Sequence, residues 1–171
     1  SKPMVAAASI FVLLLGGWMT SVNAASNSLP GDTLYSLKLA TEATRLKLAS
    51  REHRAVLHTE FAQRRYEEVL AISETPEKDV YVAEVLEAFH VQIDLANSNL
   101  QQLQNETGED RVKIATVVDQ KIEELTTVIE GAAAQSTDTQ DIKEVTVVLE
   151  STKEVSDSAV DVIVEAHEEA N

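Results

Sequence analysis

The chain has 171 residues, no cysteine and a formal net charge of −15 at pH 7. The absence of cysteine excludes disulfide bonds, thiolate metal sites and cysteine nucleophiles, and the negative charge excludes nucleic acid as a partner. Residues 76–171 contain six basic and 22 acidic residues, whereas residues 26–75 are neutral with seven of each. Because only three prolines and five glycines are available to turn the chain, we predict long helices with a solvated acidic surface.

Residues 1–25 are predicted to direct the chain to a membrane, because the segment is mostly apolar and no charged residue occurs between Lys2 and Asp32. Two interpretations remain open. The small-residue pattern Val22-Asn23-Ala24 fits a signal peptide that is cleaved at its end, whereas residues 4–25 as an intact helix are long enough to anchor the chain in the inner membrane. Under both interpretations, residues 26–171 are predicted to lie outside the cytoplasm, in the periplasm or at the cell surface.

A turn and a helix start are predicted directly after this leader. In the run Leu29-Pro30-Gly31-Asp32, proline and glycine favour a tight turn, and the aspartate is predicted to cap the helix that follows. That helix is predicted over residues 33–73, with a bend near Ser50. Its first apolar side chains are predicted to dock it against the bundle or the membrane face: Leu34, Tyr35 and Leu37. The alternative is that the same segment is an epitope for a partner at the membrane surface.

Helices are also predicted over residues 76–105 and 108–134. Thr75 followed by Pro76 is typical of a helix start, and Thr107 with Asp110 resembles a capping box. Both helices carry apolar residues at spacings of three and four, which is the pattern of a bundle seam. The first seam consists of Val82, Leu86, Phe89, Ile93, Ala96, Leu100 and Leu103, and the second of Ala115, Val118, Ile122, Leu125, Ile129 and Ala132.

The last helix is predicted over residues 138–169, where Thr137 and Gln140 resemble another capping box. Its predicted inner face is Ile142, Val145, Leu149, Thr152, Ser156, Ala159, Ile163 and Ala166, flanked by Val148, Val155, Val160 and Val162. The valines at positions 160 and 162 also fit a strand, which is the alternative for this segment. Together the elements predict an all-α fold, in which the N-terminal signal or transmembrane helix precedes an antiparallel up-down bundle of about four long amphipathic helices. A pair of loosely packed long hairpins is the alternative arrangement.

The run Leu29-Pro30-Gly31-Asp32-Thr33-Leu34-Tyr35-Ser36-Leu37-Lys38 resembles the start of an uncharacterised family of bacterial extracytoplasmic helical domains. Members of that family typically follow a membrane segment, and some lie behind an anti-sigma-factor-like cytoplasmic part. The similarity extends to about residue 71, with Arg45-Leu46 and Ala62-Gln63-Arg64-Arg65-Tyr66-Glu67 as further matching positions. The resemblance implies an extracytoplasmic location and a helical fold, and it implies no mechanism.

One metal-ligating pattern occurs in the predicted second helix. Glu87 and His90 match the Glu-x-x-His pattern of carboxylate-bridged di-iron bundles, and Asp94 lies one turn further on. That pattern needs a second copy, and the residues preceding the other histidines do not supply one. We therefore interpret these three residues as a solvated polar stripe, with a divalent cation as the weaker hypothesis. His53 lies on the apolar stripe of the first helix, which favours a hydrogen-bonded core or interface histidine.

No set of residues in the sequence adds up to a catalytic centre or to a cofactor site. We therefore expect a non-enzymatic interaction, sensing or structural module of a bacterial cell envelope, with a protein partner at or in the membrane. One alternative is an accessory subunit of a membrane complex, in which residues 4–25 remain in the bilayer and pack against partner helices. Another is a periplasmic metal- or stress-responsive helical chaperone, for which exposed apolar grooves are the distinguishing feature.

Overall fold

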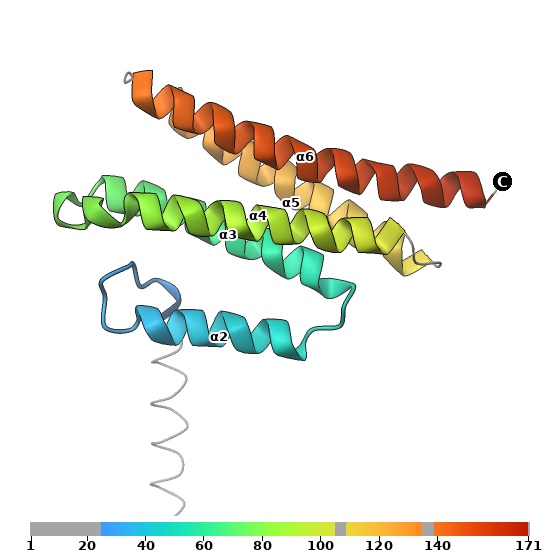
Figure 1. Cartoon of the computed structure of the whole chain (residues 1–171), viewed down its shortest axis with the longest axis horizontal. Helices are drawn as coiled ribbons and strands as arrows, with labels where there is room; N and C mark the ends of the chain where they lie inside the picture. The colour runs from blue at the N-terminus through green and yellow to red at the C-terminus, as the bar shows by residue number, and fades with distance from the viewer. Residues whose placement is uncertain (1–24, 105–108, 135–138, 171) are drawn as a thin grey trace, which may run out of the picture. The chain divides into compact units, whose positions relative to one another are not determined.

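The computed structural model describes residues 25–104, 109–134 and 139–170, and these residues contain helices and no strand. Figure 1 labels the elements, which are α2 (Tyr35–Leu48), α3 (His53–Ser73), the 3-10 helix η1 (Pro76–Tyr81), α4 (Val82–Gln104), α5 (Glu109–Ala133) and α6 (Thr139–Glu169). The predicted all-α class is therefore confirmed. The chain divides into two compact units, residues 1–45 and residues 46–171, and each unit is described by itself below.

The predicted leader lies outside the described residues apart from Ala25. None of the helices in the described part of the chain combines the length and the apolar character that crossing a bilayer requires.

The segment predicted as one helix over residues 33–73 contains two helices in the structure. Helix α2 ends at Leu48 and α3 begins at His53. In the intervening segment the Ser50 hydroxyl lies 3.1 Å from His53 Nδ1, and the Arg54 N–H donates to the Arg51 carbonyl over 3.2 Å. The interruption therefore occurs at the position where a bend is predicted.

The predicted helix 76–105 begins as the 3-10 helix η1 before it becomes α4. Thr75 is extended, Pro76 occupies the first helical turn, and the Lys78 N–H donates to the Thr75 carbonyl over 2.8 Å. The Thr75 hydroxyl donates to the Ala71 carbonyl over 3.1 Å and so stabilises the end of α3. The buried residues of α4 follow the predicted seam, except that its first turn buries Val85 where Val82 and Leu86 were predicted: Val85, Phe89, Ile93, Ala96, Leu100 and Leu103.

Helices α5 and α6 occupy the ranges predicted as 108–134 and 138–169 to within one residue at each end. The predicted capping boxes at Thr107 and Thr137 lie outside the described residues. The buried face of α6 is rotated from the predicted one, because it contains Val148, Thr152, Val155, Ala159 and Val162. Valine side chains are apolar and those of serine are not, so three of the four valines predicted as flanking residues lie inside while Ser156 is only half-buried. The fourth, Val160, is exposed. The segment that also fitted a strand, residues 160–162, is helical.

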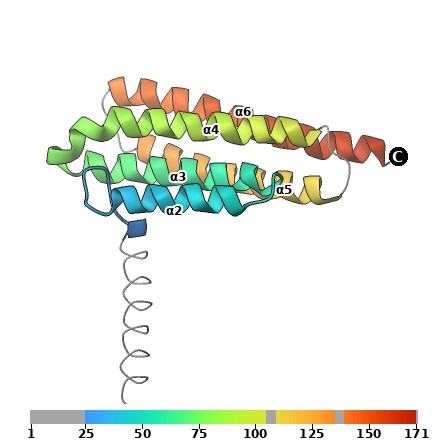
Figure 2. The same ribbon diagram turned by 60° about the horizontal axis from the view of Figure 1, so that its bottom comes forward.

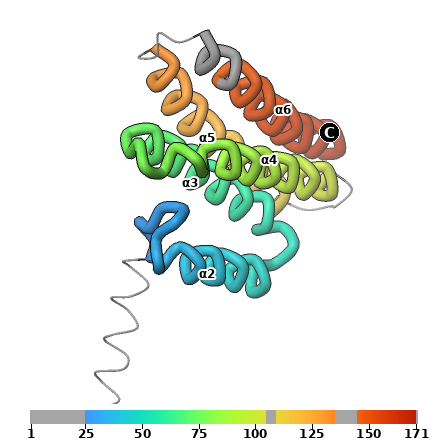
Figure 3. Tube along the Cα trace, turned by 60° about the vertical axis from the view of Figure 1, so that its left-hand side comes forward, coloured from blue at the N-terminus to red at the C-terminus, as the bar shows by residue number. Residues whose placement is uncertain are grey.

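Within the unit of residues 46–171, helices α3 to α6 form a bundle of two antiparallel hairpins, α3 with α4 and α5 with α6 (Figure 3). The hairpins pack so that α4 lies beside α6 and α3 beside α5, and each of these two pairs runs in the same direction (Figure 2). Helices α4 and α5 are therefore diagonal, which differs from the predicted bundle in which consecutive helices are neighbours. One apolar core joins all four helices and includes Ala62, Phe89, Leu100, Val118, Leu125 and Val155.

Candidate functional site

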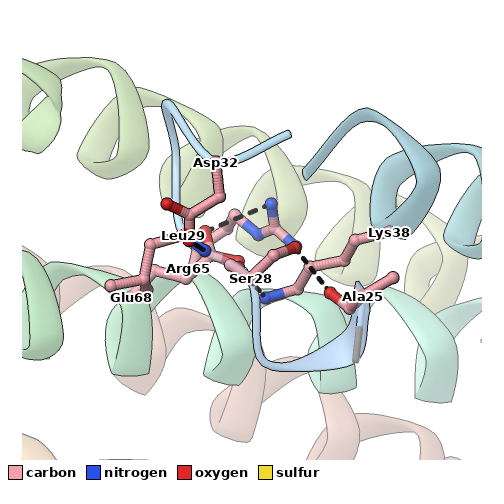
Figure 4. Close-up of polar contacts among 7 residues, drawn as sticks. All are labelled: Ala25, Ser28, Leu29, Asp32, Lys38, Arg65 and Glu68. Atoms are coloured by element: carbon pink, nitrogen blue, oxygen red, sulfur yellow. Dashed lines mark hydrogen bonds and ion pairs between the residues drawn. The ribbon is translucent and has the colours of Figure 1, made fainter. Parts of the chain in front are cut away.

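The Leu-Pro-Gly-Asp motif forms a tight turn in the unit of residues 1–45. The Asp32 N–H donates to the Leu29 carbonyl over 2.9 Å, and Gly31 has a φ of 85°. Proline at the second position and a positive φ at the third are the features of a type II turn, so glycine is required there for its backbone freedom. The Asp32 carboxylate accepts a hydrogen bond from the Leu29 N–H over 2.8 Å, which closes the turn from its other side (Figure 4).

The helix after this turn begins later than predicted. Helix α2 starts at Tyr35 where residue 33 was predicted, and the Tyr35 N–H donates to the Asp32 carbonyl over 3.1 Å. Leu34 belongs to the turn that leads into the helix, and its carbonyl accepts from the Lys38 N–H over 3.1 Å. The Asp32 carboxylate thus accepts a hydrogen bond from Leu29 on the N-terminal side of the turn, and its predicted role as a cap of the first helical turn stays a prediction.

Lys38 ties the start of α2 to the residues that precede the turn. Its Nζ donates to the Ser28 carbonyl over 3.2 Å and lies 5.9 Å from the centre of the Tyr35 ring. Ser28 in turn donates from its hydroxyl and its N–H to the Ala25 carbonyl, over 2.6 and 3.0 Å. Figure 4 shows the bonds that link Lys38 to Ser28 and Ser28 to Ala25. These contacts tie residues 25–38 together as a compact connection at the start of the domain.

Figure 4 also draws an ion pair on α3, in the unit of residues 46–171. The Arg65 guanidinium lies 3.2 Å from the Glu68 carboxylate, one helical turn further on. Both side chains are buried, so each charge compensates the other where water does not reach them.

The three candidate metal ligands lie along α4 and are not brought together with further ligands. Glu87 and Asp94 are exposed, and His90 is half-buried with its ring 5.3 Å from the ring of Phe89. Within the described residues, no three side chains of histidine, aspartate or glutamate are placed so that they could hold a metal ion.

The prediction for His53 is wrong, and a different histidine has the buried position. His53 is exposed at the start of α3, whereas His58 is only 6% exposed and its Nδ1 lies 2.8 Å from the Gln92 Oε1 of α4. Burial lowers the pKa of His58, because the charged imidazolium loses its hydration, while the hydrogen bond to Gln92 opposes this effect and the nearby Arg54 charge adds to it. Folding therefore favours the neutral form of His58 over the protonated form.

Each interface between neighbouring helices of the bundle contains a polar contact. His58 contacts Gln92 between α3 and α4, and Lys121 lies 3.4 Å from the Glu60 carboxylate between α5 and α3. The remaining two contacts involve α6, where the Ser156 hydroxyl donates to Asp119 over 2.7 Å and the Ser158 hydroxyl donates to Asn97 over 2.5 Å. Polar contacts of this kind fix the register of helices that apolar seams alone would allow to slide.

A buried arginine joins three helices at one end of the bundle. Arg111 of α5 is 5% exposed, donates to the Gln104 carbonyl at the end of α4 over 3.2 Å and forms an ion pair with Glu169 of α6. The sequence contains the signal for this position, because Arg111 precedes Ala115 and Val118 at the spacings of four and three that define the α5 seam. An arginine can occupy such a position when its guanidinium bonds to helix-end carbonyls.

The described residues of the bundle form at least two surface hollows. The first, of about 490 Å³, lies between the starts of α3 and α5 and has an apolar floor that consists of Val56, Ile114 and Val117. The second, of about 600 Å³, lies between α5 and α6 and is flanked by Glu123, Glu130 and Lys153. Surface hollows with apolar floors are where ligands and partner side chains bind, so these two are the candidate binding sites.

A family model described as a domain of unknown function, DUF5667, matches residues 27–169. No curated protein and no solved structure matches this chain.

Proposed function

We propose a function for this chain, which belongs to the family of the domain of unknown function DUF5667. It is a non-enzymatic interaction module that works outside the cytoplasm. The observation that carries the proposal is the use of polar groups in the bundle. His58, Asp119, Asn97 and Lys121 bond to groups on neighbouring helices, so these side chains hold the scaffold together. We therefore expect a partner protein to bind on the outer surface, which has the two hollows and a strongly acidic composition.

The proposed location has support from the sequence. Residues 1–25 have the apolar composition of an export signal or a membrane anchor, and the chain has no cysteine. The compact Leu29–Asp32 turn follows this segment directly, so the domain begins within a few residues of the proposed membrane segment. As an accessory subunit of a membrane complex, the protein would keep residues 4–25 in the bilayer.

Two measurements test location and attachment. The first is the intact mass of the native protein, which distinguishes a chain cleaved after Ala24 from one that retains the leader. The second is protease treatment of intact spheroplasts, in which we expect the domain to be digested without detergent. Protection of the domain until detergent is added places it in the cytoplasm and overturns the proposed location.

The interaction role is tested in cells by photo-crosslinking from exposed surface positions. A crosslinking amino acid at Thr127, beside the α5–α6 hollow, is compared with one at Val80 of η1, which is exposed and lies on neither hollow. We expect stoichiometric crosslinks to one protein from at least one position. The absence of crosslinks from every exposed position that is sampled contradicts an interaction role.

A helical chaperone is a second candidate, because the α3–α5 hollow has an apolar floor. Val117 in this floor is 38% exposed and so is accessible to a bound chain. If this hollow holds unfolded chains, the full-length protein should suppress heat-induced aggregation of a model enzyme, and Val117→Asp should abolish the suppression.

A further inference from the structure

The groove between α5 and α6 combines an apolar floor with charged walls. It has a volume of about 600 Å³ and lies on the outer side of the hairpin, with Ile122, Leu149 and Thr152 at its base. Ile122 is almost fully buried and Leu149 is half-buried, so the groove opens from the core to the surface. A groove between two antiparallel helices is the shape into which the side chains of a further helix pack.

The α5 wall of the groove is negatively charged. Glu123 and Glu130 are both exposed and are seven residues apart, which is two helical turns or about 10 Å along the axis. Helix α6 contributes nine acidic residues and two basic ones over 139–169, so the field around the groove is negative even though Lys153 lies on its rim. A ligand with positive charges at a two-turn spacing matches these carboxylates.

The α6 wall continues beyond the groove as a strip of polar and apolar residues that ends in two exposed valines. Leu149, Lys153, Ser156, Val160 and Val164 follow at spacings of four and three, so they lie on one face of the helix. Val160 and Val164, at 43% and 48% exposed, are open to solvent at the end of this strip. The strip lengthens the docking surface by about three helical turns from the centre of the groove, which suits an elongated ligand.

We propose that the α5–α6 groove binds a cationic amphipathic helix of a partner protein. Its apolar stripe packs on Leu149, Val160 and Val164, and basic side chains two turns apart pair with Glu123 and Glu130. The partner is a different protein, because a second copy of this acidic hairpin would bring like charges together across the contact. The inference rests on the proposed function and names the partner class for it.

The test uses the full-length protein in a nonionic detergent and a fluorescent 18-residue synthetic peptide, with leucines on one helical face and lysines two turns apart beside them. Binding is followed by fluorescence anisotropy. E123Q/E130Q removes both carboxylates of the groove, and E87Q/D94N is the matched control, because those residues are also exposed and seven apart, on α4. We expect E123Q/E130Q to raise the Kd about fivefold and the control to raise it less than twofold.

A double variant tests the two valines at the end of the strip. Val160→Thr with Val164→Thr replaces one methyl group of each side chain with a hydroxyl and nearly keeps its shape, so we expect a weakening of several fold with the charge unchanged. Equal weakening by E123Q/E130Q and E87Q/D94N overturns the proposal, because binding then depends on overall charge. A peptide with glutamates in place of its lysines that binds equally well also overturns it, as does a sedimentation result in which the chain self-associates through this groove and excludes the peptide.

Failure of this inference is distinguishable from failure of the proposed function. Stoichiometric crosslinks from Val80 without crosslinks from Thr127 retain the interaction role and remove the groove as its site. Protection from protease in spheroplasts removes the extracytoplasmic role whether or not the peptide binds.

Discussion

Two leucines on α4 provide the sharpest test of the bundle, because they are five residues apart and differ in burial. Leu100 is fully buried in the core, whereas Leu95 is 39% exposed. Replacing Leu100 with alanine removes buried carbons and leaves a cavity, which costs about 3 to 5 kcal/mol of the free energy of unfolding. The same change at Leu95 loses only part of the transfer energy and leaves no closed cavity, so we expect a cost of about 1 kcal/mol.

The assay is urea unfolding of the two variants and the unchanged protein, followed by circular dichroism at the helical band. Because both substitutions are leucine to alanine on one helix, their effects on helix propensity cancel in the comparison. The dependence of the unfolding free energy on urea should be the same in all three proteins, since the surface exposed on unfolding hardly changes. If Leu95→Ala costs as much as Leu100→Ala, α4 does not bury the face described above, and the predicted seam is refuted with it.

Further predictions concern single residues. Because the pKa of His58 is lowered in the folded protein, the unfolded chain binds more protons near its ordinary pKa of about 6.5, so stability should fall as the pH drops through that value, and His58→Gln should flatten this dependence in unfolding titrations. Burial raises the pKa of Tyr66, so stability should fall as the pH rises through about 10, and Tyr66→Phe should remove that loss. Arg111→Met should cost about 1 to 2 kcal/mol in urea unfolding, because the Gln104 carbonyl and Glu169 lose their donor. Gly31→Ala should destabilise the turn by about 1 to 2 kcal/mol because of its positive φ, measured as faster hydrogen exchange of the Asp32 amide. Gly131→Ala should stabilise α5 by about 0.5 to 1 kcal/mol, since the added methyl meets nothing within 4 Å.

Local chemistry in the sequence was enough to predict much of the fold. The Pro30-Gly31 pair predicts a turn because one residue fixes φ and the other tolerates a positive value, and the structure contains that turn. The seam of α4 follows from spacings of three and four, and most of its predicted members are buried. These features depend on residues within one or two helical turns, and the sequence contains that information directly.

Features that depend on distant residues were not predictable in the same way. The rotation of α6 reflects a choice between faces that both contain apolar residues, and its neighbours α4 and α5 decide which valines lie inside. His58 and Gln92 are 34 residues apart, so nothing near His58 indicates that it is the buried histidine. The interruption between α2 and α3 was predicted only as a bend, because the surrounding residues favour a helix throughout.

The candidate site likewise combines features that local sequence predicts with features that depend on distant residues. The walls of the α5–α6 groove come from Glu123 on one helix and Lys153 on another, and their juxtaposition requires the hairpin to be formed. The sequence indicated an acidic half of the chain without indicating where that charge meets an apolar floor. The burial of Arg111 could be predicted from its spacing in the α5 seam. Its partners could not, because they lie at the ends of two other helices.

The pairing of parallel helices across the two hairpins has a consequence for how the domain assembles. Contacts within each hairpin need only two consecutive helices and one connection to be in place, as for His58 with Gln92, which are 34 residues apart. Contacts of α4 with α6, such as Asn97 with Ser158, join residues 61 apart and form only when the hairpins dock. Docking therefore requires both hairpins to be complete, so the four-helix core closes only after α6 has been synthesised.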